Sequence, residues 1–303
     1  MDIYLPIAGM SVNALLIVAL GALVGLLSGM FGVGGGFLTT PLLIFYGIPP
    51  TVAVASATTQ ITGASVSGAY AHWKRGGVDF RMGGVMIAGG LLGTLAGAAI
   101  FRLLENSGQI DLLIGFLYVI LLGSIGVLML KDAVIALGWV APPLIAAAPK
   151  RHNRWVASLP LRWRFYASGL YISPLAPMAL GFIAGILTVL LGVGGGFILV
   201  PAMIYILGMA ARVVIGTSLV MIVAVSAVAT FILALTTQSV DIVLAGLLLL
   251  GGVVGAQYGA RLATRLKPDL LRLALAVIIL LVALRMALGL AWQPDEIYTV
   301  TGL

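Results

Sequence analysis

Two matching glycine-rich runs have the spacing that best suits binding chemistry in this sequence. Residues 32–37 read GVGGGF, residues 192–197 repeat the same letters, and Pro41 returns as Pro201 in the same register. A helix that starts at the end of each run presents free N–H groups and a partial positive charge, and glycines let an anion approach that backbone closely. The runs therefore predict an anion cradle formed by Gly34, Gly35, Gly36 and Phe37 in one half and by Gly194, Gly195, Gly196 and Phe197 in the other.

The segment after each short apolar segment is rich in hydroxyl and amide side chains for so apolar a chain. Such groups can hold the oxygens of an anion as neutral donors, and the candidates are Ser56, Thr58, Thr59, Gln60, Thr217 and Ser218. Gln257 adds a donor from a later segment, 242–262, that otherwise indicates helix packing. Two plainer interpretations compete. Hydroxyls in helices often bond to the preceding turn, and glycines often only let membrane helices pack closely. Because the run occurs twice, each time before a short apolar segment, we favour the cradle.

Other chemistry finds little support in the residue types. No Asp or Glu falls in the middle of an apolar segment, which argues against a cation pathway or a proton-relay carboxylate. With no Cys and two distant His residues, a usual zinc site is not expected, and neither a nucleophile elbow nor a Walker loop is present. We expect no metal, no cofactor and no enzymatic activity. His72, near basic and aromatic residues, is a possible gate or proton site, although an interfacial anchor is the plainer interpretation.

The composition places these residues in a membrane. The hydrophobic fraction is 62%, the charged fraction is 8% and the mean hydropathy is +1.21, whereas a soluble domain is about 25% charged. Apolar stretches recur at the length of roughly 20 residues that a helix needs to cross the hydrocarbon, and they are too continuous for barrel strands. The sequence therefore predicts an all-α integral membrane protein. The net charge of +7 then reflects cytoplasmic loops rather than nucleic-acid binding.

The chain divides into two related halves with five apolar segments each. The segments cover residues 11–30, 37–47, 52–72, 82–103 and 111–130, and then 172–191, 197–208, 213–236, 242–262 and 269–290. The second half also repeats Val78-Asp79 as Val240-Asp241, and it repeats the glycine row of Gly90, Gly93 and Gly97 as Gly252, Gly255 and Gly259. We interpret these glycine rows as helix-packing surfaces. We expect a first membrane repeat at 1–130, a basic cytoplasmic linker at 131–171 and a second membrane repeat at 172–303.

Two consecutive halves with an odd number of crossings each must have opposite orientations in the membrane, and the charges agree with this arrangement. If the chain starts outside and crosses at every segment, the basic residues fall inside, with Arg102 and Arg285 as exceptions. We therefore expect inverted-topology repeats of about five helices, with periplasmic N- and C-termini. A rival topology makes 37–47 and 197–208 re-entrant, but it places the basic block at 261–272 outside. Whether these short segments span fully stays open.

At the repeated glycine motif the chain resembles a known family, the sulfite exporter TauE/SafE family, also called the 4-toluenesulfonate uptake permeases. The resemblance rests on residues 32–37 with Pro41, on residues 192–197 with Pro201, and on residues 215–219 (IGTSL). The counterpart at 55–59 (ASATT) matches the family pattern more loosely. The resemblance implies transport of sulfite or an organosulfonate, often as export.

The residues themselves leave three functions open. The first is a secondary anion transporter that works by alternating access, the second is a passive anion channel, and the third is a membrane scaffold that transports nothing. The expected partners are a small anion, membrane lipids and, in a homo-oligomer, further copies of the chain, and the expected location is the inner membrane of a bacterium. Because sulfite titrates near neutral pH, a carrier could couple protons through its substrate.

Overall fold

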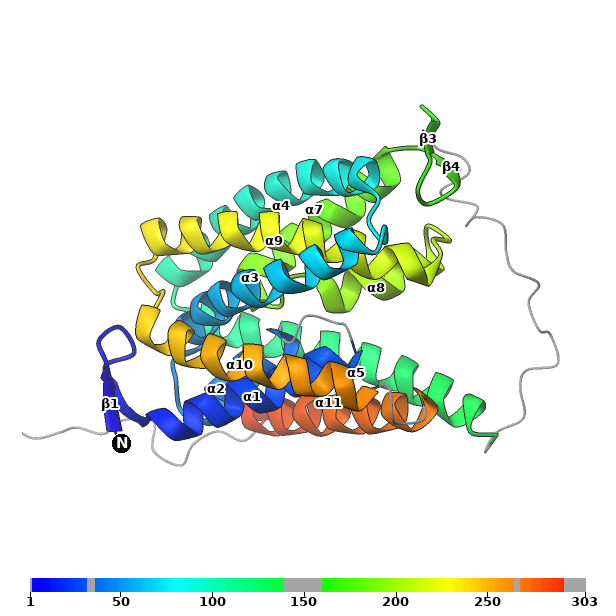
Figure 1. Ribbon diagram of the computed structural model, residues 1–303. Helices are drawn as coiled ribbons and strands as arrows, with labels where there is room; N and C mark the ends of the chain where they lie inside the picture. The colour runs from blue at the N-terminus through cyan, green and yellow to red at the C-terminus, as the bar shows by residue number, and fades with distance from the viewer. Residues whose placement is uncertain (1, 32–35, 139–159, 264–267, 292–303) are drawn as a thin grey trace, which may run out of the picture.

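The computed structural model describes residues 2–31, 36–138, 160–263 and 268–291, and the described part is mostly helical (Figure 1). The first half contributes α1 (Ala14–Phe31), α2 (Gly36–Phe45), α3 (Pro50–Lys74), α4 (Phe80–Asn106) and α5 (Ile110–Ala136). The second half contributes α7 (Leu175–Leu191), α8 (Gly196–Tyr205), α9 (Ala211–Thr236), α10 (Ile242–Ala263) and α11 (Pro268–Ala291). Each half thus gives a long helix, a ten-residue helix and three further long helices in the same order.

The helices confirm the apolar segments of the sequence to within a few residues. Within the described residues, five helices are long and apolar enough to cross a membrane, and they belong to α4, α5, α9, α10 and α11. The apolar helices α1, α2, α7 and α8 are shorter. The short helices α2 and α8 each contain a proline, Pro41 and Pro201, within their ten residues. The chain is therefore a multi-pass helical membrane protein by length and composition.

Two β-hairpins correct the expectation of an all-α protein. Strands β1 (Asp2–Leu5) and β2 (Met10–Asn13) pair antiparallel before α1, and strands β3 (Trp163–Phe165) and β4 (Leu170–Ile172) pair antiparallel before α7. Residues 11–13 and 172 therefore belong to strands rather than to membrane helices. The second hairpin also lies inside the segment expected to be a linker, and α5 runs on to Ala136. Residues 139–159 of that segment lie outside the described part, and the division into repeats stays a prediction.

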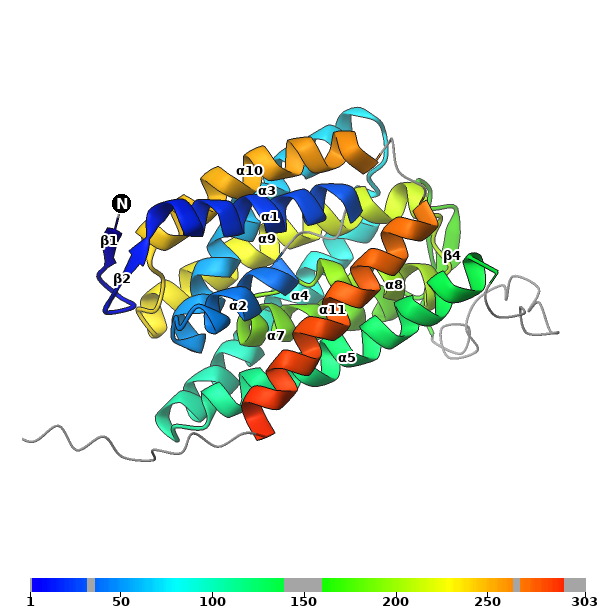
Figure 2. The ribbon, with the colours of Figure 1, turned by 90° about the horizontal axis from the view of Figure 1, so that it is seen from below.

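The two halves are interleaved rather than placed side by side. Helix α1 packs against α10 of the other half, and α7 packs in the same way against α4. Helices α3 and α9 pack against each other, as do α5 and α11, which cross in Figure 2. A Cβ added at Gly93 would lie 2.0 Å from the carbonyl oxygen of Phe182, and one at Gly255 would lie 2.0 Å from that of Ala22. These contacts confirm that the glycine rows allow close helix packing.

A buried aspartate joins each hairpin to the other half. Asp79 accepts hydrogen bonds from the backbone N–H of Met82 (3.0 Å) and of Ser168 (3.0 Å), and from the Ser168 hydroxyl. Its own N–H donates to the hydroxyl of Thr217 on α9 (3.0 Å). The carboxylate thus caps the start of α4 and also holds the turn of the β3–β4 hairpin.

Asp241 repeats this arrangement at the other end of the molecule. Its carboxylate accepts from the N–H of Leu244 (3.1 Å) and of Ile7 (3.2 Å), and its N–H donates to the hydroxyl of Ser56 on α3 (3.2 Å). Figure 1 shows the β1–β2 and β3–β4 hairpins at opposite ends of the bundle. The matching Val-Asp pairs of the sequence therefore have matching structural roles.

Candidate functional site

The two short helices that follow the glycine runs meet at their first residues. The rings of Phe37 and Phe197 stack with centroids 4.3 Å apart and planes 8° from parallel, and both side chains are buried. The starts of α2 and α8, predicted from the sequence to form the cradle, therefore lie together in the interior. Gly34 and Gly35 lie outside the described residues, so their part in the cradle stays a prediction.

The second glycine run is buried and tightly packed. Gly192, Gly194 and Gly195 all have left-handed φ angles near +70°, which glycine adopts without strain. A Cβ added at Gly194 would lie 2.7 Å from the side chain of Ile61, and one at Gly36, the first residue of α2, would lie 1.9 Å from the same side chain. A side chain at either position would therefore displace Ile61 of α3, and the left-handed φ of Gly194 favours glycine there as well.

A hydroxyl pair fixes the carbonyl that precedes the second run. The Leu191 carbonyl oxygen accepts a hydrogen bond from the hydroxyl of Thr40 (3.2 Å) and another from the phenol of Tyr118 (2.5 Å). Both hydroxyl-bearing residues belong to the first half and are fully buried. This contact ties the end of α7 to α2 and α5, and so it sets the position at which α8 begins.

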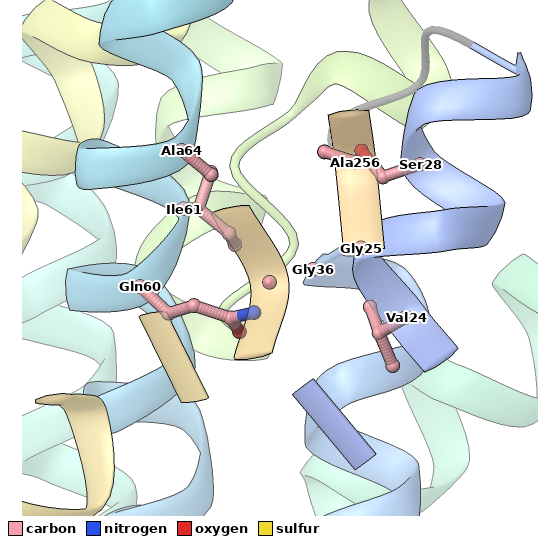
Figure 3. A pocket seen from close by; sticks show the side chains of 9 residues that line it. Val24, Gly25, Ser28, Gly36, Gln60, Ile61, Ala64 and Ala256 are labelled. Carbon is pink, nitrogen blue, oxygen red and sulfur yellow. The ribbon is translucent and has the colours of Figure 1, made fainter. Parts of the chain in front are cut away.

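A narrow pocket lies beside the start of α2, between α1, α3 and α10 (Figure 3). The lining residues are Val24, Gly25 and Ser28 of α1, Gly36 of α2, Gln60, Ile61 and Ala64 of α3, and Gly252 and Ala256 of α10. The cavity volume is about 20 Å³, which is close to the room that one water molecule needs. A polyatomic anion therefore requires these helices to separate. The structure brings two predicted site residues, Gly36 and Gln60, to this one pocket.

The amide of Gln60 is held in a defined orientation at the pocket. Its Oε1 accepts a hydrogen bond from the Thr39 hydroxyl (3.0 Å), and its Nε2 donates to the Leu248 carbonyl oxygen (3.5 Å). Because a carbonyl accepts only, this contact assigns Nε2 to the side that faces Leu248 and Gly252. The side chain is 4% exposed. Its second N–H makes no hydrogen bond to the described part of the chain, so it can serve a bound acceptor.

Other predicted hydroxyls are engaged elsewhere. Thr58 donates to the Val54 carbonyl (2.8 Å), Thr59 to that of Ala55 (3.1 Å), and Ser218 to that of Ile215 (2.9 Å). These contacts match the alternative in which hydroxyls bond to the preceding turn. Ser56 and Thr217 instead hold the N–H groups of the two buried aspartates described above.

Two further candidates lie away from the pocket. Gln257 is exposed on α10 and does not belong to the pocket lining, and His72 is half-buried in the last turns of α3. Sequence reasoning missed Ser28, Ala256 and Tyr118. Ser28 is a lone hydroxyl in an apolar helix, so no pattern in the sequence singles it out.

A comparison with family models gives a match to the sulfite exporter TauE/SafE model over residues 17–286. This match covers most of the chain, including both glycine runs. The chain belongs to the TauE/SafE family. The family is one of transporters and not of enzymes, which confirms two predictions made from the sequence.

Curated relatives of this TauE/SafE chain carry transporter names without a substrate. The chain is 29% identical over 275 residues to the "Probable membrane transporter protein YjnA" of Bacillus subtilis, with 89% of this chain and 98% of that protein covered. It is 30% identical over 285 residues to a "Probable membrane transporter protein" of Xylella fastidiosa, with 91% and 95% covered. No solved structure matches this TauE/SafE chain. The chain is therefore a membrane transporter whose substrate the relatives leave open.

Proposed function

We propose that this TauE/SafE chain is a secondary transporter that exports sulfite or an organosulfonate by alternating access. The observation that carries the proposal is the meeting of α2 and α8 at Phe37 and Phe197, beside the Gln60 pocket. In inverted-repeat transporters, short helices at matching positions point their N-termini at an anionic group near the middle of the membrane. The family model, which is that of a sulfite exporter, supports a sulfur oxyanion as that group.

The helix pairing supports inverted-topology repeats. The first helix of each half packs against the fourth helix of the other half, α1 against α10 and α7 against α4. A two-fold relation between the halves produces this reciprocal packing. The hairpins at opposite ends of the bundle, each bound to the aspartate of the other half, support the same relation (Figure 1). Such a pair of repeats can rock around a shared site and open it to one side at a time.

The distribution of charge supports an orientation in the bacterial inner membrane. Lys74, Arg75 and Arg81 cluster where α3 connects to α4, and the Arg81 guanidinium donates to the Arg164 carbonyl of the β3–β4 hairpin (3.3 Å). The positive-inside rule makes this end cytoplasmic. The N-terminal hairpin and Asp241 then face the periplasm, as do both termini of the chain.

The chemistry of the pocket supports a singly charged anion. Among the described lining residues there is no Lys or Arg, and the available groups are neutral donors together with the start of α2. A fully desolvated dianion would need a cationic partner, whereas a helix N-terminus supplies only about half a positive charge. Protonated sulfite and simple alkanesulfonates are monoanions. For sulfite, which takes up a proton near neutral pH, proton coupling can proceed through the substrate, and no carboxylate in the membrane is required.

The test is labelled sulfite flux in proteoliposomes, with methanesulfonate, sulfoacetate, taurine, sulfate and chloride as competitors, each measured with and without a pH gradient. We expect saturable sulfite flux that the monoanion methanesulfonate competes and chloride does not. Empty liposomes and a variant at the exposed residue Leu281 serve as controls. If the folded protein moves none of the labelled anions, the proposed function is wrong and the scaffold alternative gains support.

Counterflow separates a carrier from a passive channel. A carrier accelerates uptake of labelled sulfite when unlabelled sulfite is present on the opposite side, because the loaded site returns faster than the empty one. Flux without such stimulation would favour the channel.

A further inference from the structure

The Gln60 pocket, called the first-half pocket after α1, α2 and α3 although α10 also lines it, has a second-half counterpart between α7, α9 and α4, at positions that the repeat relates. Gly252 and Gly90 show the relation. A Cβ added at Gly252 would lie 3.0 Å from Nε2 of Gln60, and one added at Gly90 would lie 2.9 Å from Cε of Met221. Met221 therefore occupies, against α4, the place that Gln60 occupies against α10. The remaining matched pairs, with the residue of the Gln60 pocket first and that of the counterpart second, are Ser28 and Thr188, Ala64 and Val225, and Ala256 and Thr94.

The second-half counterpart is filled with apolar atoms. Met221 and Val225 are each 1% exposed, and the Val225 side chain would lie 2.5 Å from a Cβ at Gly90. The two threonines there use their hydroxyls within their own helices, Thr94 on the Gly90 carbonyl (2.8 Å) and Thr188 on the Ala184 carbonyl (2.7 Å). This site offers no spare side-chain donor to a ligand.

The first-half pocket differs at each of these positions. Alanines replace the bulkier Val225 and Thr94, which leaves the cavity. The Ser28 hydroxyl lines that cavity and makes no hydrogen bond to the part of the chain that the structure describes, unlike its counterpart Thr188. Gln60 likewise keeps one N–H without a partner among those residues. Two donors, one of them on a side chain that is 96% buried, therefore line one pocket beside the start of α2.

We infer that the chain binds one monoanion, at the pocket between α1, α3 and α10 alone, with Gln60 and Ser28 as donors and the start of α2 as the positive pole. The counterpart between α7, α9 and α4 is closed by Met221 and Val225. This inference rests on the proposed function for the identity of the anion but not for the existence of the site. It makes Gln60 a specificity-determining residue, because its amide supplies a donor that the methionine at the matching position lacks.

The first experiment compares matched substitutions in the flux assay. Gln60→Met is expected to lower the apparent sulfite affinity about tenfold or more, which corresponds to the loss of one hydrogen bond to a charged group. Met221→Leu, a conservative change at the counterpart, should leave flux within about twofold. Equal losses in both variants would mean two equivalent sites, and full activity in Gln60→Met would remove Gln60 from the site. Either result overturns the inference.

The second experiment does not depend on the substrate. The chain contains no cysteine, so Ser28→Cys and Thr188→Cys each introduce a single thiol. We expect the Ser28→Cys thiol to react about tenfold faster with an anionic sulfonatoethyl methanethiosulfonate than with its trimethylammonium analogue, and the Thr188→Cys thiol to react slowly with both. Equal rates at Ser28→Cys, or faster labelling of Thr188→Cys, overturn the inference. Anion-selective labelling in a protein that moves no sulfite would instead support the site and refute the proposed substrate.

Discussion

Replacing Asp79 tests whether the cross-half contact of a hairpin holds the fold together. The carboxylate is 3% exposed, and it accepts three hydrogen bonds, from Met82 and from two groups of Ser168. Asp79→Ala removes all three and leaves buried donors without partners. Asp79→Asn is the matched variant, since its side-chain oxygen can still cap α4 while its NH₂ group faces the donors of Ser168.

The expected loss of unfolding free energy follows from the number of hydrogen bonds to the Asp79 carboxylate. Loss of an N-cap costs about 1 kcal/mol, and a hydrogen bond to a charged group contributes about 1.5–3 kcal/mol. Because the three bonds share one carboxylate and are not additive, we expect Asp79→Ala to lower the free energy of unfolding by about 3–5 kcal/mol. Asp79→Asn should cost about half as much. Asp241→Ala should cost less than Asp79→Ala, since Asp241 accepts two bonds and Asp79 accepts three.

The assay is reversible unfolding in mixed micelles with increasing sodium dodecyl sulfate, followed by tryptophan fluorescence, to which Trp163 on β3 contributes. Asp2→Ala, at an exposed position on β1, is the control and should change stability by less than about 0.5 kcal/mol. If Asp79→Ala were no more destabilising than Asp2→Ala, the hairpin contact would have no role in stability and the reasoning would be wrong.

Three further predictions concern a packed glycine on α10, the hydrogen bond of Tyr118 and the left-handed backbone at Gly195. Gly255→Leu should lower the free energy of unfolding by about 3 kcal/mol or more in the same micelle titration, because its Cβ would overlap the Ala22 carbonyl. Gly246→Leu, where a Cβ meets open space, is the control and should not destabilise the protein. Tyr118→Phe should cost about 0.5–1.5 kcal/mol, since it deletes one of two donors to the carbonyl that precedes the second glycine run; no change would show that the phenol is dispensable. Gly195→Ala should reduce flux strongly while membrane insertion, measured by extraction yield, persists, because φ is +72° there and a Cβ is strained; normal flux would argue against a cradle at α8.

The sequence predicted the helices well because long apolar runs leave few alternatives. The segment expected at 82–103 is α4 at Phe80–Asn106, and the segment expected at 197–208 is α8 at Gly196–Tyr205. The hairpins were not predicted, because strands of three or four residues carry too few side chains to show an alternating pattern. The hairpin at 163–172 was further hidden by the basic residues around it, which resemble those of a loop.

The site was predicted in part. Gly36 and Gln60 reach the same pocket, because the glycine run and the polar segment lie on adjacent elements. Ser56 and Thr217 were grouped with them by residue type, but each one bonds to the N–H of a residue in the opposite half. Contacts between segments so distant in the sequence cannot be inferred from either segment alone.

The exchange of contacts between the halves also sets the order in which the protein can be completed. Ile7 and its partner Asp241 are separated by 234 residues, which a ribosome adding about 5–20 residues per second needs roughly ten to fifty seconds to make. During that interval α1 lacks α10, the helix against which it packs. The first half is therefore synthesised before the helices that cover it, and its final packing requires the last quarter of the chain.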